Sequence, residues 1–371
     1  ERRTHGLLWS KREVRGAMEI AGKSVGESSP TYFIADVAAN HDGVLDRALE
    51  LMTLAKEAGA DAAKFQHFRA DHIVSDKGFR ELGGQQSHQA SWSRSVYEVY
   101  KDASLPWAWT KPLADHAKAI GIDFFTSPYD LEAIDFVDEF VPAYKIGSGD
   151  ITWLDAIDHM ASKGKPVILA TGAATLAEVE NAVATIARHG VPYSVMQCNT
   201  NYTGVSENLN HIHLNVLSTY RERFPEALLG LSDHTHGHVT VLGAVAMGAR
   251  IIEKHFTDDV NKEGPDHHFS MTPSTWREMV DRTRDLEAAL GSSTKVVADN
   301  EKETVVIQRR GLRFARDMQA GETVAPEDIV ALRPATPGAI TPDHLHDVLG
   351  ATLTQDVTFH DIVTTELLSG R

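Results

Sequence analysis

Two histidines stand directly after two apolar runs late in the chain. The segments read Leu229-Gly-Leu-Ser-Asp-His234 and Ile251-Ile-Glu-Lys-His255. If the two runs are neighbouring parallel strands of a barrel, both imidazoles face the same mouth. Two imidazoles suit a borderline divalent ion, with water and substrate completing its shell. The alternative, two structural histidines, stays open at this point because the chain holds 19 histidines.

Lysines, hydroxyls and glycines end other apolar runs of the chain. Lys64 closes one run, and Lys145 opens the sequence Lys145-Ile-Gly-Ser-Gly-Asp150 at the end of another. Lysines bring positive charge to a phosphate or carboxylate, and glycines beside a strand end let the backbone N–H groups approach it. Asp36 and Asp150 are candidates for an acid and a base, or for orienting a water. An anionic substrate beside the histidines is the expectation.

The order of the apolar runs predicts the fold that would bring these residues together. Strand–helix alternation favours a parallel sheet, and eight units in about 260 residues favour a (β/α)8 TIM barrel. Catalytic groups of such a barrel lie at the C-terminal ends of its strands. The expected strands are 32–38, 60–66, 123–125, 143–146, 167–170, 193–197, 227–231 and 250–253. The expected helices include 45–58, 106–120, 131–140, 176–189, 210–224, 238–248 and 273–290.

The chain is expected to have four parts. Residues 1–30 are an N-terminal extension in which Met18 is a candidate start, 31–290 are the barrel, 291–308 a linker, and 309–371 a small β-rich domain. Short β-like runs of that domain are expected at 311–315, 323–324, 329–332 and 362–365. Within the barrel, the polar segment 69–105 interrupts the alternation. Such an insert is either a cover over the active site or a packed surface excursion, and the sequence leaves both open.

Composition and charge limit the kinds of molecule that this protein is expected to bind. The formal net charge of −16 argues against a broad surface for nucleic acid or for an anionic membrane. No apolar run approaches the roughly 18 residues that span a membrane. The single Cys198 excludes an intramolecular disulfide, fits a reducing cytoplasm and is expected to be a packing residue. Further histidines are expected mostly at the surface or behind the ligands, namely His67, His72, His236, His238, His267 and His268.

At these strand ends the chain resembles the sialic acid synthase (N-acetylneuraminate synthase) family. The shared motifs include Asn40-His-Asp-Gly43, Lys64-Phe-Gln66, Thr126-Ser-Pro-Tyr129, Lys145-Ile-Gly-Ser-Gly-Asp150, Ser232-Asp-His-Thr235, Glu253-Lys-His-Phe256 and Gly264-Pro-Asp266. They occur in the family's order. The tail, with Arg309-Arg310 and an Ala320-Gly-Glu322 turn, resembles the family's antifreeze-like (SAF) domain.

The resemblance implies a metal-dependent condensation of phosphoenolpyruvate with a sugar aldehyde similar to N-acetylmannosamine. The products would be a sialic-acid-like 2-keto sugar acid and phosphate. It implies Mn2+ or Mg2+ between His234 and His255, and a domain-swapped homodimer. The residues implied to hold phosphoenolpyruvate are Lys64, Ser127, Lys145, Ser148, Thr200 and Ser232. Those implied to contact the acceptor are Gln66, Tyr202, Asp266 and Arg310, with Arg309 as the alternative to Arg310.

The chain departs from the family at its two candidate catalytic carboxylates. Asp36 and Asp150 stand where Glu is usual, which shortens each side chain by about 1.5 Å. Ala170 also replaces an expected serine. These departures predict an acceptor other than N-acetylmannosamine, or an additional bridging water.

Other functions remain open from the sequence. They are the same chemistry on a non-standard acceptor in secondary-metabolite or surface-polysaccharide biosynthesis, a metal-dependent aldolase that uses pyruvate, and an inactive binding protein on this barrel. Lys64, Lys145 and Ser148 favour phosphoenolpyruvate over pyruvate, because a phosphate needs such donors. The presence of both lysines and both histidines speaks against an inactive barrel.

Overall fold

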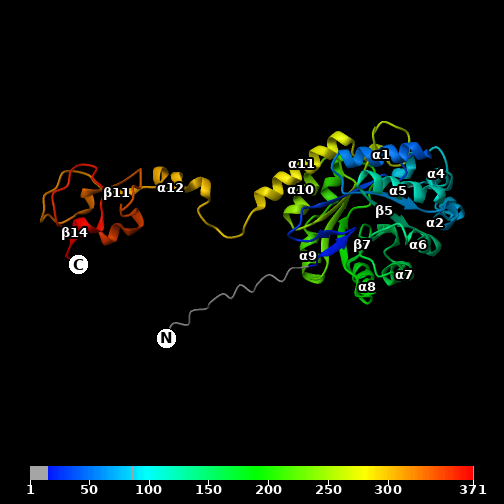
Figure 1. Ribbon diagram of the computed structural model, residues 1–371, viewed down its shortest axis with the longest axis horizontal. Helices are drawn as coiled ribbons and strands as arrows, with labels where there is room; N and C mark the ends of the chain where they lie inside the picture. Colours follow the sequence, from blue (N-terminus) through cyan, green and yellow to red (C-terminus); the bar gives the residue numbers. More distant parts are fainter. Residues whose placement is uncertain (1–15, 86, 371) are drawn as a thin grey trace. The chain divides into compact units, whose positions relative to one another are not determined.

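The computed structural model describes residues 16–85 and 87–370 (Figure 1). The chain divides into two compact units, the first ending at Gly291 and the second beginning at Ser292. Residues 1–15 of the expected N-terminal extension lie outside the described residues.

Parallel strands form the centre of the first unit. They are β3 (Tyr32–Asp36), β4 (Ala62–His67), β5 (Asp123–Pro128), β6 (Tyr144–Ile146), β7 (Val167–Ala170), β8 (Tyr193–Cys198), β9 (Leu228–Asp233) and β10 (Ile251–His255). Their hydrogen-bonded order is β5-β4-β3-β10-β9-β8-β7-β6, in one sheet of eight strands. The first strand of the barrel thus pairs with the last, and the sheet curls into a nearly closed barrel. The predicted TIM barrel is confirmed.

Helices surround these strands (Figure 1). They are α1 (Leu45–Glu57), α5 (Thr110–Ile120), α6 (Leu131–Val137), α7 (Leu154–Ser162), α8 (Leu176–Ala187), α9 (Val216–Arg223), α10 (Val239–Ala246) and α11 (Pro273–Leu290). The starts of α8 and α11 are fixed by capping boxes at Thr175 and Thr272. Apolar residues of each helix pack on the outward-facing residues of the strands and form the larger core.

Side chains of each strand alternate between the helix layer and the barrel interior. A lower interior layer is apolar and contains Tyr32, Ile34, Ala62, Phe125, Ala143, Ile168, Met196, Leu228 and Ile251. Two residues further along their strands, Ile34, Ala62, Ala143 and Ile251 are followed by Asp36, Lys64, Lys145 and Glu253. An apolar layer therefore supports a polar layer at the C-terminal ends of the strands.

A short hairpin packs on the apolar layer from the other end of the barrel. It consists of β1 (Met18–Ile20) and β2 (Lys23–Val25), which pair antiparallel. Met18, Ile20 and Val25 are buried and belong to the same core cluster as the apolar interior layer. The described part of the expected extension is thus part of the barrel's core.

The insert after β4 contains three short helices, α2 (Ala70–Ile73), α3 (Asp76–Glu81) and α4 (Val96–Ala103). Ser95 begins α4 with a capping box to Glu98. The insert follows the C-terminal end of a barrel strand, so it lies at the same end as the polar layer.

The second unit has its own core, which includes Leu312, Phe314, Met318, Val348 and Val363. Its strands are β11 (Gly311–Phe314), β12 (Ile329–Leu332), β13 (Thr352–Leu353) and β14 (Leu368–Ser369), and β11 pairs antiparallel with β12. The expected linker contains a helix, α12 (Lys302–Gln308). None of its residues is buried, so no apolar periodicity marked it in the sequence.

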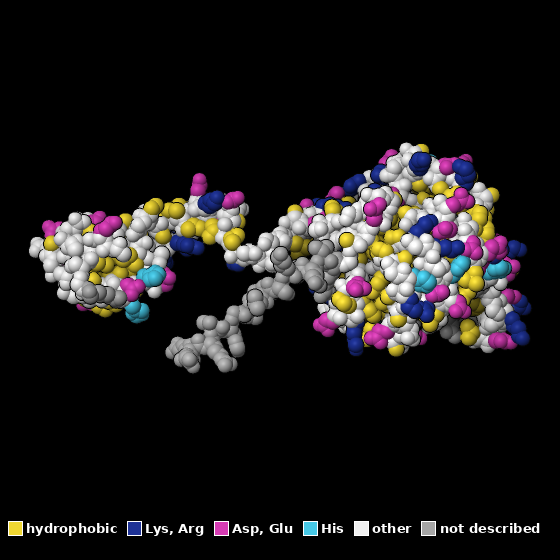
Figure 2. Space-filling model, turned by 60° about the horizontal axis from the view of Figure 1, so that its bottom comes forward, with side chains coloured by type: hydrophobic (Ala, Val, Ile, Leu, Met, Phe, Trp, Pro, Cys, Tyr) yellow, Lys and Arg dark blue, Asp and Glu magenta, His cyan; other side chains and the backbone are white. Residues whose placement is uncertain are grey.

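No described helix is both long enough and apolar enough to cross a membrane. Figure 2 shows basic and acidic side chains interspersed over the visible face of the barrel unit.

Candidate active site

Two lysines and two carboxylates form a buried cluster in the polar layer of the barrel. Lys64 Nζ lies 2.7 Å from Asp36 Oδ2, and Lys145 Nζ lies 3.3 Å from Glu253 Oε1. Lys64 also lies 3.8 Å from Glu253 Oε2. Burial raises the pKa of Glu253, but the two lysines outweigh this effect and hold that pKa below its usual value. Asp36 thus lies within ion-pair distance of Lys64, and Glu253 within ion-pair distance of both lysines, at the position where an anionic substrate was expected.

Glu253 received no role from the sequence. Ser232 Oγ donates a hydrogen bond of 3.2 Å to Glu253 Oε1, so the carboxylate links an expected phosphate ligand to both lysines. The signal that could have identified it is the strand period of two. Because Glu253 stands two residues before His255, both side chains face the barrel interior.

His255 ends β10 and His234 directly follows the neighbouring parallel strand β9, and their ring centroids are 5.4 Å apart. Both side chains are buried. The Nδ1 of His234 is 3.0 Å from the carbonyl oxygen of Asn199, which can only accept, so Nδ1 donates and Nε2 keeps a lone pair. The Nδ1 of His255 is buried without a hydrogen-bond partner, and its Nε2 lies 3.6 Å from Asp36 Oδ2. Both rings thus have a nitrogen available to a ligand.

Burial lowers the pKa of His234 to about 4 and that of His255 to about 3. Both rings are therefore neutral at pH 7, which is the form that binds metal. Among the described residues, no group of three or more His, Cys, Asp or Glu side chains is arranged to hold a metal ion. The two imidazoles fit a divalent ion whose other ligands would come from water and substrate.

Above the polar layer lies a cavity of about 360 Å³. Gln66, Tyr202 and Asp266, the three expected acceptor ligands of the barrel, all line it together with His255 and Asp150. The Tyr202 ring packs edge-on over the His234 ring, with centroids 4.3 Å apart. The volume lies within the range of small-molecule sites.

The insert covers one side of this cavity. Its Ile73, His88, Trp92, Val99, Tyr100 and Ala103 line the cavity wall. This arrangement supports the reading of residues 69–105 as an active-site cover over the reading as a surface excursion.

Two carboxyl groups facing the cavity have raised pKa values. Burial raises the pKa of Asp150 to about 6. Burial also raises the pKa of Asp266 to about 7, although a hydrogen bond from the Ala39 N–H, 3.2 Å long, lowers it. Both groups can exchange protons near neutral pH, as an acid or base of a reaction must.

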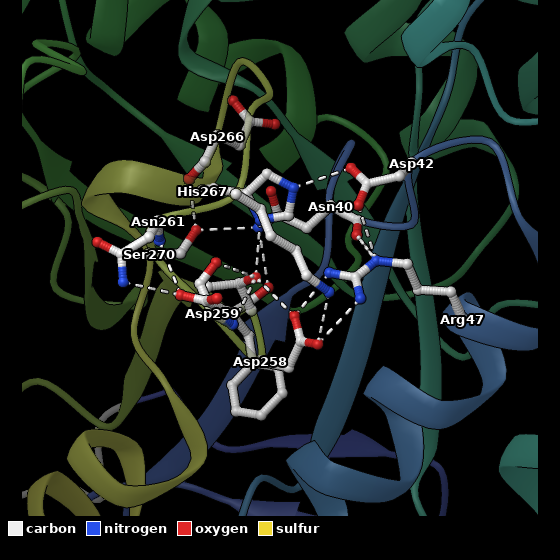
Figure 3. Close-up of polar contacts among 12 residues, drawn as sticks. Asn40, Asp42, Arg47, Asp258, Asp259, Asn261, Asp266, His267 and Ser270 are labelled. Carbon is white, nitrogen blue, oxygen red and sulfur yellow. Dashed lines mark hydrogen bonds and ion pairs between the residues drawn. The ribbon is translucent and has the colours of Figure 1, made fainter.

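A polar cluster around the buried His267 holds the loop that carries Asp266 (Figure 3). His267 Nε2 donates to Asp42 Oδ1 at 2.8 Å, and its Nδ1 accepts from Thr257 Oγ1 at 2.8 Å. Arg47 ties Asp258 of the same loop to α1 with two hydrogen bonds of 3.0 and 2.6 Å. His267, expected at the surface or behind the ligands, is fully buried, and these partners satisfy both of its ring nitrogens.

His67, expected at the surface or behind the ligands, is also buried. Its ring nitrogens lie 2.6 Å from Thr126 Oγ1 and 2.7 Å from Thr110 Oγ1. Its ring therefore links β5 and α5 by hydrogen bonds inside the barrel unit. Cys198 is buried as expected, and burial raises the pKa of its thiol to about 11, so it stays protonated at neutral pH.

The remaining predicted residues fall into two groups. Ser127, Ser148 and Thr200 lie at the strand ends: Ser127 Oγ is 3.5 Å from Lys64 Nζ, Ser148 Oγ accepts from Gly172 N at 2.9 Å, and Thr200 packs against Gly172. A Cβ at Gly172 would lie 2.5 Å from Thr200 Cγ2, so only glycine fits there. Arg310 belongs to the second unit, where its Nη1 donates to the carbonyl oxygen of Ala331 at 2.7 Å.

Known proteins share both units of the chain. The NeuB family matches residues 51–295, and the SAF domain matches residues 309–369. The N,N'-diacetyllegionaminic acid synthase of Legionella pneumophila is 36% identical, over 95% of this chain and 97% of its own length. The human N-acetylneuraminate-9-phosphate synthase is 29% identical, over 94% of this chain and 95% of its own length.

A solved structure agrees with these relatives. The N-acetylneuraminic acid (sialic acid) synthetase of Leptospira borgpetersenii superposes with a TM-score of 0.69 at 27% identity, over 80% of this chain and 97% of its own. The predicted resemblance and the SAF domain are confirmed. The chain therefore belongs to the NeuB family and is an enzyme of the sialic acid synthase type, with a C-terminal SAF domain.

Proposed function

We propose that this enzyme condenses phosphoenolpyruvate with a sugar aldehyde to give a sialic-acid-like 2-keto sugar acid and phosphate. The observation that carries the proposal is the polar layer. Buried Lys64 and Lys145 stand beside the neutral imidazoles of His234 and His255, beneath a cavity of sugar size. Lysines can hold the phosphate and carboxylate of phosphoenolpyruvate, and the relatives are named as synthases of sugar acids.

The proposed reaction forms one bond between carbons. Carbon 3 of phosphoenolpyruvate attacks the aldehyde carbon, water adds at carbon 2, and phosphate leaves with cleavage of the C–O bond. A divalent ion held by His234 and His255 would polarise the aldehyde oxygen. Asp150 faces the cavity with its pKa near 6, so in its ionised form it can take a proton from the attacking water.

The two aspartates that replace the family's usual glutamates, Asp36 and Asp150, have different surroundings. Asp36 lies in the polar layer, 2.7 Å from Lys64 Nζ and 3.6 Å from His255 Nε2, so its shorter side chain still reaches both partners. No described residue forms such a pair with Asp150, which lines the cavity. Its shorter side chain would leave room for an additional bridging water, one of the two expectations from the sequence.

Arg310 and the dimer are the part of the proposal that involves a second subunit. We propose that Arg310 of one subunit reaches the acceptor in the barrel of the other, with Arg309 as the alternative. A cytoplasmic location is the expectation that goes with this function.

A phosphate-release assay tests the function directly. We expect phosphate from phosphoenolpyruvate, Mn2+ and a panel of aldoses, with a product mass equal to aldose plus pyruvate. Lys145→Met should lower kcat/KM for phosphoenolpyruvate by about a hundredfold or more, because it removes a charged donor and leaves Glu253 with Lys64, 3.8 Å away, as its remaining lysine partner. Lys118→Met, at an exposed position on α5, serves as the matched control and should leave kcat/KM unchanged.

Two outcomes would contradict the proposal. Product formation from pyruvate without phosphate release would favour an aldolase. Phosphate release with none of the aldoses, in a protein that still binds them, would favour a binding function for the barrel.

A further inference from the structure

One tyrosine of the cavity wall has a side-chain hydroxyl without a protein partner. Tyr129 directly follows β5 and lines the cavity together with Gly147 and Asp150. Its backbone N–H donates to the carbonyl oxygen of His67 at 3.0 Å, but no described residue forms a hydrogen bond with its hydroxyl. A hydroxyl that is removed from bulk water without a partner costs free energy. We therefore expect its partner among the molecules that enter the cavity.

Packing of the aromatic ring does not require this hydroxyl. The Tyr129 ring packs edge-on against Phe68, with centroids 6.0 Å apart, and a phenylalanine ring would make the same contact. Burial raises the pKa of Tyr129 well above its usual value, so the hydroxyl stays protonated at neutral pH. A protonated hydroxyl can donate one hydrogen bond and accept another. Both remain available to a molecule in the cavity.

The end of β6 leaves space for the hydroxyl. A Cβ atom at Gly147 would lie 3.1 Å from Tyr129 Oη, which is closer than such atoms normally pack. The same Cβ would lie 3.5 and 3.6 Å from the ring carbons Cε1 and Cζ, which is ordinary contact. The φ angle of Gly147 is −70°, a value that other residues adopt freely, so the backbone does not require glycine here. The missing side chain at Gly147 therefore makes room for the hydroxyl in particular.

The same strand end carries Asp150. The Asp150 N–H donates to the carbonyl oxygen of Gly147 at 3.1 Å, so one turn joins the residue that contacts the Tyr129 hydroxyl to the carboxylate. Among the charges around Tyr129, that of Asp150 opposes ionisation of the hydroxyl most strongly and so adds most to its raised pKa. For Tyr100, on the cover, Asp266 has this place in raising the pKa. Tyr129 is therefore the closer companion of Asp150.

From this geometry we propose that Tyr129 is a water-positioning residue, whose hydroxyl and the Asp150 carboxylate hold between them the water that adds to carbon 2 of phosphoenolpyruvate. The inference rests on the proposed function and adds a residue to it. The water donates one hydrogen bond to Asp150 and the other to Tyr129 Oη. With both hydrogens held, a lone pair of its oxygen is left to face carbon 2.

The protons of this step can be followed individually. The water oxygen bonds to carbon 2, and one of its protons passes to Asp150 and from there to the alkoxide formed from the aldehyde. The second proton departs with the phosphate when the C–O bond breaks and carbon 2 becomes the keto carbon. Tyr129 neither gains nor loses a proton. A single carboxylate would leave the water free to turn about one hydrogen bond, so the second partner fixes its orientation.

Tyr129→Phe tests the proposal in the full-length enzyme with phosphoenolpyruvate, Mn2+ and the aldose that gives the highest rate. We expect kcat to fall about tenfold, as for loss of one hydrogen bond, while KM for both substrates changes by less than about twofold. Tyr193→Phe, at the start of β8 and so at the opposite end of the barrel, should leave kcat and KM unchanged. Unchanged kcat in Tyr129→Phe, with the fold verified by circular dichroism, overturns the inference and leaves the condensation standing. No phosphate release by the wild-type enzyme overturns the proposed function itself.

A double-mutant cycle separates a shared water from a structural role. In an Asp150→Asn enzyme, Tyr129→Phe should lower kcat by less than about twofold, because the water it positions has already lost its base. Equal factors with Asp150 present and absent would mean that the two residues act independently, which overturns the proposal.

A second cycle tests the position of the hydroxyl. Gly147→Ala should displace Tyr129 Oη and lower kcat in the wild-type enzyme. It should change kcat little in Tyr129→Phe, where the added methyl group meets only ring carbons at ordinary contact distance. An equal loss in both backgrounds would contradict the role given to the hydroxyl.

Discussion

At the scale of single residues, Asp150 is the side chain whose chemistry can be followed most directly. It lines the cavity, and no described residue donates a hydrogen bond to its carboxylate. Burial alone raises its pKa to about 6. The ionised carboxylate is therefore basic enough to accept a proton from water, and it is not diverted into an ion pair as Asp36 is.

We predict that kcat falls as the pH decreases through about 6, because the protonated Asp150 cannot act as a base. Asp150→Asn should remove this acidic limb and lower the plateau by about a hundredfold or more. The same raised pKa costs stability above pH 6 and nothing below about pH 4, since the ionised form is disfavoured in the folded state. Asp150→Asn should therefore raise the Tm at pH 8 and leave it unchanged at pH 4.

The second cavity carboxyl supplies the control for this prediction. Asp266 has a pKa near 7, so its own titration is displaced from that of Asp150. Asp266→Asn should keep a limb near pH 6. An acidic limb that persists near pH 6 in Asp150→Asn would show that another group is the base.

Several site residues could be predicted from the sequence because each ends an apolar run. Lys64, Lys145, His234 and His255 meet at one end of the barrel as expected. Glu253 was missed because a carboxylate inside an apolar run gives no signal by residue type. Only the strand period of two, which puts it on the face of His255, reveals it.

At the scale of elements, β9 and β10 hold the two imidazoles through a pair on their other face. Asp233 and Lys254 precede the histidines and are register partners. Lys254 Nζ lies 2.5 Å from Asp233 Oδ2 and donates to the carbonyl oxygen of Thr235 at 2.6 Å. Thr235 Oγ1 donates to the same carboxylate oxygen at 2.8 Å. This buried network fixes the ends of both strands.

We predict that Lys254→Met weakens Mn2+ binding by about 10- to 100-fold without touching the metal, as changes behind metal ligands do. It should also lower the free energy of unfolding by about 3–5 kcal/mol, because Asp233 stays buried without its cation. Calorimetric titration with Mn2+ measures the first effect independently of activity. Lys254→Arg keeps the charge and should recover part of the affinity. Wild-type Mn2+ affinity in Lys254→Met would mean that the pair only stabilises the fold.

The sequence predicted the barrel strands well because their apolar runs and period are local signals. The hairpin at Met18–Val25 could not be predicted in the same way. Its strands have three residues each, which is too short for a clear apolar period. Ile20 is buried because it packs on the apolar interior layer of the barrel, a contact that its neighbours in the sequence do not reveal. Likewise, the role of the insert depended on where Trp92 and Val99 lie in space, which their spacing along the chain does not reveal.

At the scale of the whole molecule, the barrel unit contains nearly every residue the proposed chemistry needs. The exception is the arginine expected from the SAF domain. Arg310 precedes β11 in the second unit, so a swapped dimer would make each active site depend on two chains. The residue types of a sequence do not show whether a tail packs on its own barrel or on the barrel of a second chain, because both contacts need the same kinds of side chain.

Complementation between an inactive barrel variant and an impaired tail variant tests this exchange. His255→Ala disables the barrel of one chain, and Arg310→Ala should lower kcat/KM for the acceptor by about 10- to 100-fold through loss of a charged hydrogen bond. In a swapped dimer formed by co-expressing both variants, one site combines the intact barrel of the Arg310→Ala chain with the intact tail of the His255→Ala chain. We therefore expect the mixed dimer to regain up to half of the wild-type kcat/KM for the acceptor, measured by phosphate release.

The matched control combines two barrel variants. His234→Ala co-expressed with His255→Ala disables both barrels, so no exchange of tails can restore a site, and activity should stay absent. If His255→Ala and Arg310→Ala also fail to complement in a purified mixed dimer, each tail serves its own barrel or none. The same pair built with Arg309→Ala decides which arginine acts, because only loss of the contributing arginine both lowers activity alone and is corrected by the partner's tail.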